Sequence, residues 1–90
     1  MNIGDIVISI NGRDKDKRFL VIAIEENYAL IANGKTRRLE KPKRKKNKHL
    51  RNESIAEKII VEKISEKKLT NNEIRRYLAA TKGEIPDAER

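Results

Sequence analysis

The chain has 90 residues and a net charge of +8; 37% of its residues are hydrophobic, 40% are charged and three are aromatic. This length suits one small domain with an extension, whose core must be built mainly from Ile, Leu, Val and Ala. The absence of cysteine excludes disulfides and thiolate metal sites and agrees with a reducing cytoplasm, and no apolar run approaches the roughly 18 residues needed to span a bilayer.

Residues 1–41 contain short β-branched runs separated by turn residues, a pattern typical of strands. Four strands are expected, at residues 4–10, 19–24, 28–32 and 36–40. Asn11-Gly12 and the charged residues 13–18 predict a loop between the first two. The run 19–24 is apolar throughout, as expected of a strand that meets protein on both faces. Curling of these strands into a small barrel would hide the sheet edges.

Asn33-Gly34 is a strong hairpin signal, because both residues accept the positive φ of a type I′ turn. We expect this turn to join the strands at 28–32 and 36–40. Pro42 then ends the second of these strands, since proline cannot donate a hydrogen bond to the ladder.

The positive charge is concentrated at residues 35–51, which hold ten Lys or Arg against one acid, Glu40, and so carry +9. Residues 41–51 show no apolar periodicity before Leu50, and repulsion between their cations favours an extended, exposed loop. Leu50 can begin a short closing strand or pack against the rim of the barrel. Nucleic acid is the partner that such a segment attracts most strongly, since each neutralised phosphate releases counterions. The competing interpretation is a solvated loop that only keeps the protein soluble.

After residue 52 the apolar period becomes helical. Ser54 and Glu57 match the S-x-x-E capping box. A helix of about twelve residues should follow, because apolar side chains recur at helical spacing. Its apolar stripe is Ile55, Ile59, Ile60 and Ile64. A strand over 59–61 is the weaker alternative.

Thr70 and Glu73 form a second capping box, ahead of Ile74, Tyr77 and Leu78 at helical spacing. Gly83 and Pro86 would close this helix, and residues 84–90 are expected to form a flexible tail. The two helices predict a hairpin that covers one face of the barrel. The alternative is a docking surface for a protein partner or a second subunit.

The N-terminal half resembles a KOW domain, the small SH3-like barrel module of ribosomal proteins and transcription elongation factors. The resemblance is carried by Gly4-Asp5-Ile6-Val7, by the segment from Ile8 to Lys15 with Gly12 as the motif glycine, and by the apolar run 19–24. The stretch from Asn33 to Leu50 is similar to a narrower group, the large-subunit ribosomal proteins of archaeal and eukaryotic type and their bacterial KOW-containing RNA-binding relatives. Over residues 3–50 this implies a barrel that contacts RNA, ribosomal RNA in particular, without catalysis.

One position departs from the KOW pattern. Many KOW loops have a second glycine where Asp16 stands, and Asp tolerates left-handed backbone conformations better than most residues.

The expected fold class is α+β, a small SH3-like β-barrel of KOW type followed by a C-terminal helical hairpin. The barrel with its basic loop 41–51 should span residues 1–52, the two-helix extension residues 53–83, and the tail residues 84–90.

The predicted RNA contacts are the cations of the basic segment: Lys35, Arg37, Arg38, Lys41, Lys43, Arg44, Lys45, Lys46, Lys48 and Arg51. The resemblance adds Arg13, Lys15 and Lys17, although the alternating charges of 13–18 can also form a self-neutralising turn. The segment lacks interleaved aromatic residues, so recognition of RNA shape and backbone is expected rather than base reading. Phe19 and Tyr28 are expected in the core, and base stacking is the alternative role for both. Neutralisation of about six phosphates predicts a log-log salt slope of about −4 to −5.

No pattern in the sequence predicts catalysis, a cofactor or a metal site. His49 is the only histidine, and no nucleophile with a partner base or glycine-rich phosphate loop is present. Asp14 and Asp16 could suggest a cation-binding loop, but cations flank them and the rest of the calcium-loop pattern is missing. We therefore expect a protein that is not an enzyme.

The sequence thus predicts a cytoplasmic RNA-binding protein, associated with ribosomal RNA or ribosomal particles, with the helices as a candidate site for a protein partner. The alternative is a protein-interaction KOW module of the transcription or translation machinery. A membrane partner is not expected, because the basic segment lacks the neighbouring apolar anchor that stable attachment requires.

Overall fold

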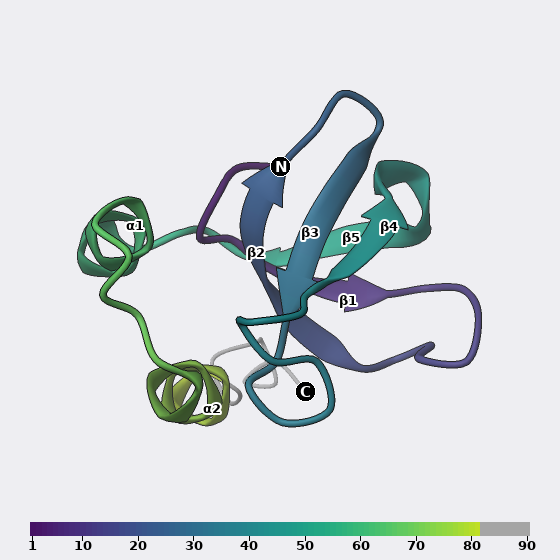
Figure 1. The fold of residues 1–90 in the computed structure, drawn as a ribbon. Helices are drawn as coiled ribbons and strands as arrows, with labels where there is room; N and C mark the ends of the chain where they lie inside the picture. Colours follow the sequence, from purple (N-terminus) through teal and green to yellow (C-terminus); the bar gives the residue numbers. More distant parts are fainter. Residues whose placement is uncertain (82–90) are drawn as a thin grey trace.

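The computed structural model describes residues 1–81; the expected helix end at Gly83 and Pro86 and the expected tail 84–90 lie outside this range. The elements in chain order are β1 (Ile6–Ser9), β2 (Arg18–Ile24), β3 (Tyr28–Ala32), β4 (Lys43–Lys46), the 3-10 helix η1 (Asn47–His49), β5 (Leu50–Ser54), α1 (Lys58–Ser65) and α2 (Asn71–Ala80) (Figure 1). The strands form one antiparallel sheet in the order β4-β3-β2-β1-β5. The expected α+β class, with two helices after the strands, is confirmed.

The sheet is strongly bent, because its two edge strands follow each other in the chain. Neighbouring strands lie about 4.8 Å apart, so the edges of a flat five-stranded sheet would be roughly 19 Å apart. The three residues of η1 that join β4 to β5 can reach at most about 14 Å. Backbone hydrogen bonds fix this connection on both sides: Asn47 donates to the carbonyl of Asn27 (2.9 Å), and Ile10 donates to that of His49 (2.9 Å).

Alternation along the strands produces two buried clusters, one on each face of the sheet. Leu20 belongs to the cluster beneath the helices, whereas its neighbours Phe19 and Val21 belong to the other. The first cluster contains Ile6, Leu20, Ala32, Ile60, Leu69, Ile74 and Leu78, and the second contains Val7, Phe19, Val21, Ala29, Ile31 and Leu50. The expectations that this strand is covered on both faces and that Phe19 is a core residue are therefore confirmed, although Ile24 at its end is 42% exposed.

The predicted hairpin at Asn33-Gly34 is wrong, and residues 36–40 form turns and bends instead of a strand. Gly34 has φ +76°, but Asn33 does not have the positive φ that a type I′ turn also requires. The Asn33 side-chain oxygen instead accepts hydrogen bonds from the backbone N–H groups of Lys35 and Arg37 (2.9 Å each). This local bonding, which asparagine offers as an alternative to a strand ladder, closes a turn over residues 33–37 at the start of the loop 33–42.

The predicted exposed loop over residues 41–51 is also wrong. β4 pairs with β3 (Leu30 opposite Arg44), η1 makes the connection, and Leu50 begins a closing strand, β5, as expected. Charged residues suit β4 because it is an edge strand, where their side chains also discourage pairing with other chains.

The first helix begins later than expected. Ser54 is the last residue of β5 and pairs with Ile6, so the Ser54–Glu57 capping box does not form and α1 starts at Lys58. The second capping box is confirmed: the Thr70 hydroxyl accepts a hydrogen bond from the Glu73 backbone N–H, and the Glu73 carboxylate accepts one from that of Thr70 (3.1 Å each).

Both helices lie on one side of the sheet (Figure 1) and act as the expected lid. Ile60, Ile74 and Leu78 are buried against the sheet, but Ile55 (81% exposed) and Ile59 (54%) do not join this cluster as predicted. Arg18 of β2 ties the end of α2 down by donating to the Leu78 carbonyl (2.6 Å). Within residues 1–81 the helices are too short and polar to cross a membrane.

Candidate nucleic-acid interface

A cleft of about 220 Å³ lies between the β1–β2 loop, the loop 33–42 and β4. Four of its lining residues are cations: Arg13, Lys17, Arg37 and Lys43. The other lining residues are Asp14, Phe19 and Thr36. The β1–β2 loop extends away from the helices in Figure 1. Cations from three separate chain segments, all predicted as RNA contacts, therefore meet around one concave surface.

Asp14 lines this cleft and forms ion pairs with two lysines of β4. It is only 8% exposed, and its Oδ1 accepts hydrogen bonds from Lys45 Nζ (2.9 Å) and Ser9 Oγ (3.1 Å), while Lys43 Nζ lies 3.5 Å from Oδ2. Burial by itself raises the pKa of Asp14, but the hydrogen bonds from Lys45 and Ser9 and the charges of Lys45 and Lys43 lower that pKa to about 2. The carboxylate therefore stays ionised and holds the β1–β2 loop against β4.

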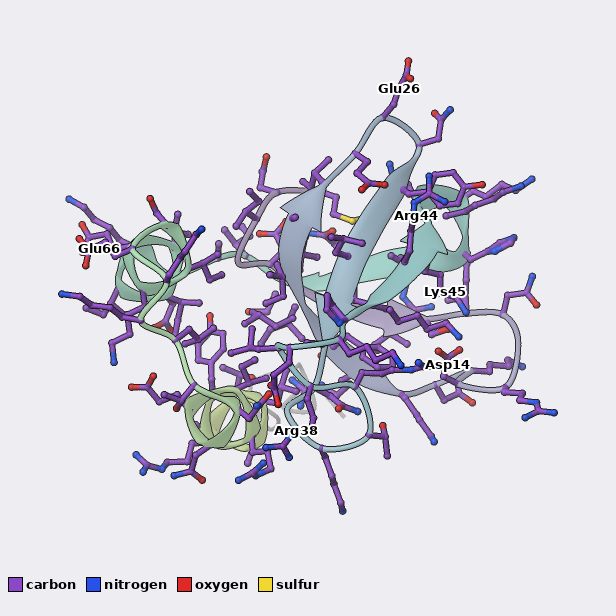
Figure 2. The ribbon with its side chains drawn as sticks, in the orientation of Figure 1. Asp14, Glu26, Arg38, Arg44, Lys45 and Glu66 are labelled. Atoms are coloured by element: carbon purple, nitrogen blue, oxygen red, sulfur yellow. The ribbon has the colours of Figure 1, made fainter. Side chains whose placement is uncertain are left out.

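Lys45 is the one predicted contact that the structure buries. It is 8% exposed, and its ammonium group also donates to the Asn11 carbonyl (2.8 Å). Figure 2 shows Lys45 and Asp14 near each other on the side of the sheet away from the helices. Lys45 is thus a structural cation that fixes the loop, and it is not available at the surface for a phosphate.

The backbone of the β1–β2 loop has the left-handed conformations that its sequence suggested. Gly12 has φ +85° and Asp16 has φ +72°. The Asp16 backbone N–H donates to the Ser9 carbonyl (2.7 Å), which closes the loop. Asp16 therefore adopts the conformation for which glycine is usual, and the loop presents Arg13 and Lys17 at the cleft.

Three of the four cations of the cleft are exposed, although Asp14 lines the cleft too. Arg13, Lys17 and Arg37 are exposed and form no ion pair within residues 1–81, whereas Lys43 is half-buried beside Asp14. Uncompensated cations in a concave site focus a positive potential and attract anions. The arrangement can hold phosphate oxygens, which Arg and Lys bind through charge-assisted hydrogen bonds.

The outward face of β4 carries a second group of cations. Side chains alternate along a strand, so Arg44 and Lys46 point away from the face that holds Lys43 and Lys45. The guanidinium carbon of Arg44 lies 3.7 Å from the centroid of the Tyr28 ring, and Arg44 Nε is 2.7 Å from the Glu25 carboxylate. Tyr28 is half-buried at this surface and does not belong to either core cluster, so its predicted place in the core is wrong.

The remaining predicted contacts are spread around these two groups. Arg38 pairs with Glu40 (3.2 Å), and Arg51 lies opposite Ile8 on β5, the other edge strand. Exposed side chains on loops or on η1 complete the set: Lys15, Lys35, Lys41 and Lys48. The structure thus gathers part of the predicted set around the cleft and leaves the rest dispersed.

Residues 1–81 contain no cluster of three or more His, Cys, Asp or Glu side chains that could hold a metal ion. His49 is half-buried in η1, and Asp14 is engaged with lysines. For Tyr28 the structure favours the alternative to a core position, because the pairing of β3 with β4 leaves it half-buried at the surface. No protein-family model matches this chain, and no curated protein shows significant similarity to it.

Proposed function

We propose that this chain is a non-catalytic, cytoplasmic RNA-binding protein that docks on the phosphate backbone of structured RNA. The observation that carries the proposal is the convergence of Arg13, Lys17, Arg37 and Lys43 on one cleft. Ribosomal RNA and ribosomal particles are the proposed targets, and this part rests on the KOW resemblance of residues 3–50.

The bent sheet supports assignment to the SH3-like barrels of KOW type. Its edge strands are consecutive in the chain and joined by three residues, as a sheet that rolls on itself requires. The positive φ values of Gly12 and Asp16 in the loop that resembles the KOW motif support the same assignment. The helices then serve as a lid on the outer face of the sheet.

A fixed cleft favours recognition of RNA backbone geometry. Lys43 is oriented by Asp14, and its strand is held in the sheet, so little side-chain freedom is lost on binding. Backbone contacts position a protein without reading the sequence, whereas the shape of the RNA helix decides which phosphates can be reached together.

The test is a comparison of two double variants with equal changes in net charge. Arg13→Glu with Arg37→Glu reverses two exposed cations of the cleft; Lys58→Glu with Arg76→Glu reverses two exposed cations of the helices. We expect the cleft variant to bind a base-paired RNA duplex about tenfold or more weakly, because two phosphate contacts become repulsive. The helix variant should bind within about twofold of the unmodified protein. Equal losses in both variants would show that only net charge matters and would refute the cleft.

Lys45 is excluded from this experiment. Its removal would leave Asp14 buried without its closest cation, so a loss of binding could reflect loss of folding.

A protein-interaction module is the second candidate, and the exposed side chains of Ile55 and Ile59 favour it. Nuclease treatment before a pull-down separates the two functions. Loss of ribosome association after treatment supports RNA binding, and retention supports a protein partner.

A further inference from the structure

A second cavity, of about 420 Å³, lies where the β2–β3 turn meets η1. It is lined by Asn27, Tyr28, Lys46, Asn47 and Lys48. Its volume falls within the range of about 300–1,000 Å³ that is typical of small-ligand sites. An aromatic ring, two side-chain amides and two ammonium groups are therefore gathered around one hollow.

Strand pairing creates this combination. Tyr28 lies directly opposite Lys46 in the β3–β4 ladder, and the Asn47 backbone N–H donates to the Asn27 carbonyl (2.9 Å). The basic segment has no aromatic residue of its own, but the neighbouring strand supplies one. Segments separated by about twenty residues thus form a single surface that is both basic and aromatic.

We propose that this cavity binds one unpaired nucleotide of the RNA, with its base against Tyr28 and its phosphates near Lys46 and Lys48. The inference rests on the proposed RNA-binding function and extends it from the backbone to a base. Single-stranded bases bind proteins by stacking on aromatic rings next to cationic side chains, which hold the backbone.

The Tyr28 ring is held in place for such a role. The Arg44 guanidinium lies over the ring at 3.7 Å, and the Glu25 carboxylate in turn holds Arg44 (2.7 Å). A ring fixed in this way loses little freedom when a base stacks on it. Arg44 covers one face of the ring and does not itself line the cavity.

Asn47 gives the cavity a polar group suited to a base edge. Its side-chain oxygen is buried and has no hydrogen-bond partner within residues 1–81. An unsatisfied buried acceptor is unfavourable, and Asn47 lines the cavity on a side chain whose terminal torsion is broad, so a ligand there can recruit the amide by rotation. Base edges carry both donors and acceptors, so a base can complement an amide that has both.

The test uses three RNA duplexes that differ at one point. The first is fully paired, the second carries a single-nucleotide bulge, and the third carries an abasic residue at the bulge. We expect the unmodified protein to bind the bulged duplex about tenfold more tightly than the other two, because only that duplex supplies an unpaired base. In NMR spectra the side-chain amide signals of Asn27 and Asn47 should shift with the bulged duplex alone.

Two variants at Tyr28 identify the ring as the cause. Tyr28→Phe keeps the aromatic face and should keep the preference for the bulge. Tyr28→Leu keeps apolar bulk but removes the aromatic face, so it should abolish the preference while affinity for the paired duplex changes less than about twofold.

The outcomes separate this inference from the proposed function. Equal binding of all three duplexes overturns the nucleotide site but leaves backbone binding intact, and so does a preference that survives Tyr28→Leu. Binding of none of the duplexes overturns the proposed function and the nucleotide site together. If Tyr28→Leu does not fold, the abasic duplex and the amide signals of the unmodified protein still test whether the cavity binds an unpaired base.

Discussion

At the scale of single residues, Asp14 joins the β1–β2 loop to β4 at the candidate interface. Its alternation with Arg13 and Lys15 suggested charge compensation between sequence neighbours. Its ion-pair partners are instead Lys43 and Lys45, about thirty positions away. The sequence showed that Asp14 would be ion-paired, but the identity of its partners depends on where β4 lies in the sheet.

Stability should fall in acid because of this carboxylate. The pKa of Asp14 is lowered from 3.8 to about 2 in the folded chain, so its contribution is complete above about pH 4 and is lost as the pH falls from 4 to 2. At about 1.4 kcal/mol per pKa unit, the loss in the free energy of unfolding is roughly 2 kcal/mol. Denaturant unfolding at a series of pH values measures it.

Asp14→Asn is the matched variant for this measurement. It should be less stable than the unmodified protein at neutral pH, by about 3 kcal/mol, because Lys45 would remain buried without a countercharge. Between pH 4 and pH 2 its stability should fall less steeply. Parallel pH profiles for the two proteins would contradict the assignment.

Tyr28 lies at the surface, although its position in a strand suggested burial. The prediction of a strand over residues 28–32 correctly placed it in β3, where its neighbour Ala29 is fully buried. Whether the opposite face is covered depends on the neighbouring strand, and here that strand brings Arg44 rather than an apolar residue. The position of Tyr28 could therefore not be derived before the pairing of β4 was known.

At the scale of elements, the main difference from the sequence prediction is β4, which was expected to be part of an exposed loop. Strands are recognised by alternation of apolar and polar residues, and Lys43–Lys46 has no apolar residue. The alternation is nevertheless present, since Lys45 is buried beside Asp14 while Arg44 and Lys46 are exposed. On the buried face of β4, the ion pair between Lys45 and Asp14 stands where most strands have an apolar contact. The four residues of β4 alone therefore do not indicate a strand.

The two capping boxes illustrate how tertiary structure selects between equal local signals. Thr70 and Glu73 form their reciprocal hydrogen bonds, whereas Ser54 is held in the β1–β5 ladder. The backbone just after Ser54 is held too, because the Asp5 carboxylate accepts a hydrogen bond from the Ala56 N–H (2.8 Å). The sequence located both helices correctly, but only packing could show where the first one begins.

The C-terminus of α1 offers a stabilising substitution. Lys67 has φ +58°, and backbone hydrogen bonds from Lys68 to the Lys63 carbonyl (2.8 Å) and from Lys67 to that of Ile64 (3.1 Å) form a Schellman motif. Glycine suits this left-handed position, so Lys67→Gly should raise the free energy of unfolding by roughly 1 kcal/mol.

Lys67→Ala is the control for that measurement, because it removes the same charge but retains the Cβ atom. Thermal or denaturant unfolding should show little change for the alanine variant. An equal gain in both variants would attribute the effect to charge and would contradict the backbone explanation.

At the scale of the whole molecule, the loop 33–42 links the cleft to the helices, because Asn71 and Arg75 of α2 form hydrogen bonds with it. The helices cover one face of the sheet, while the β1–β2 loop and β4 lie away from them (Figure 2). The concentration of charge in residues 35–51 was evident from the sequence, which also predicted the covered strand 19–24 and, against the alternative of a docking surface, the helical lid. The cleft was not, because it brings together residues from three segments that only the fold places in contact.

The salt dependence of RNA binding tests the central claim most directly. Six cations face RNA in this account: Arg13, Lys17, Arg37 and Lys43 at the cleft, with Lys46 and Lys48 at the second cavity. If each neutralises one phosphate, the logarithm of the association constant for structured RNA should fall with the logarithm of salt concentration at a slope of about −4 to −5. An affinity that does not change with salt would contradict backbone docking through these residues.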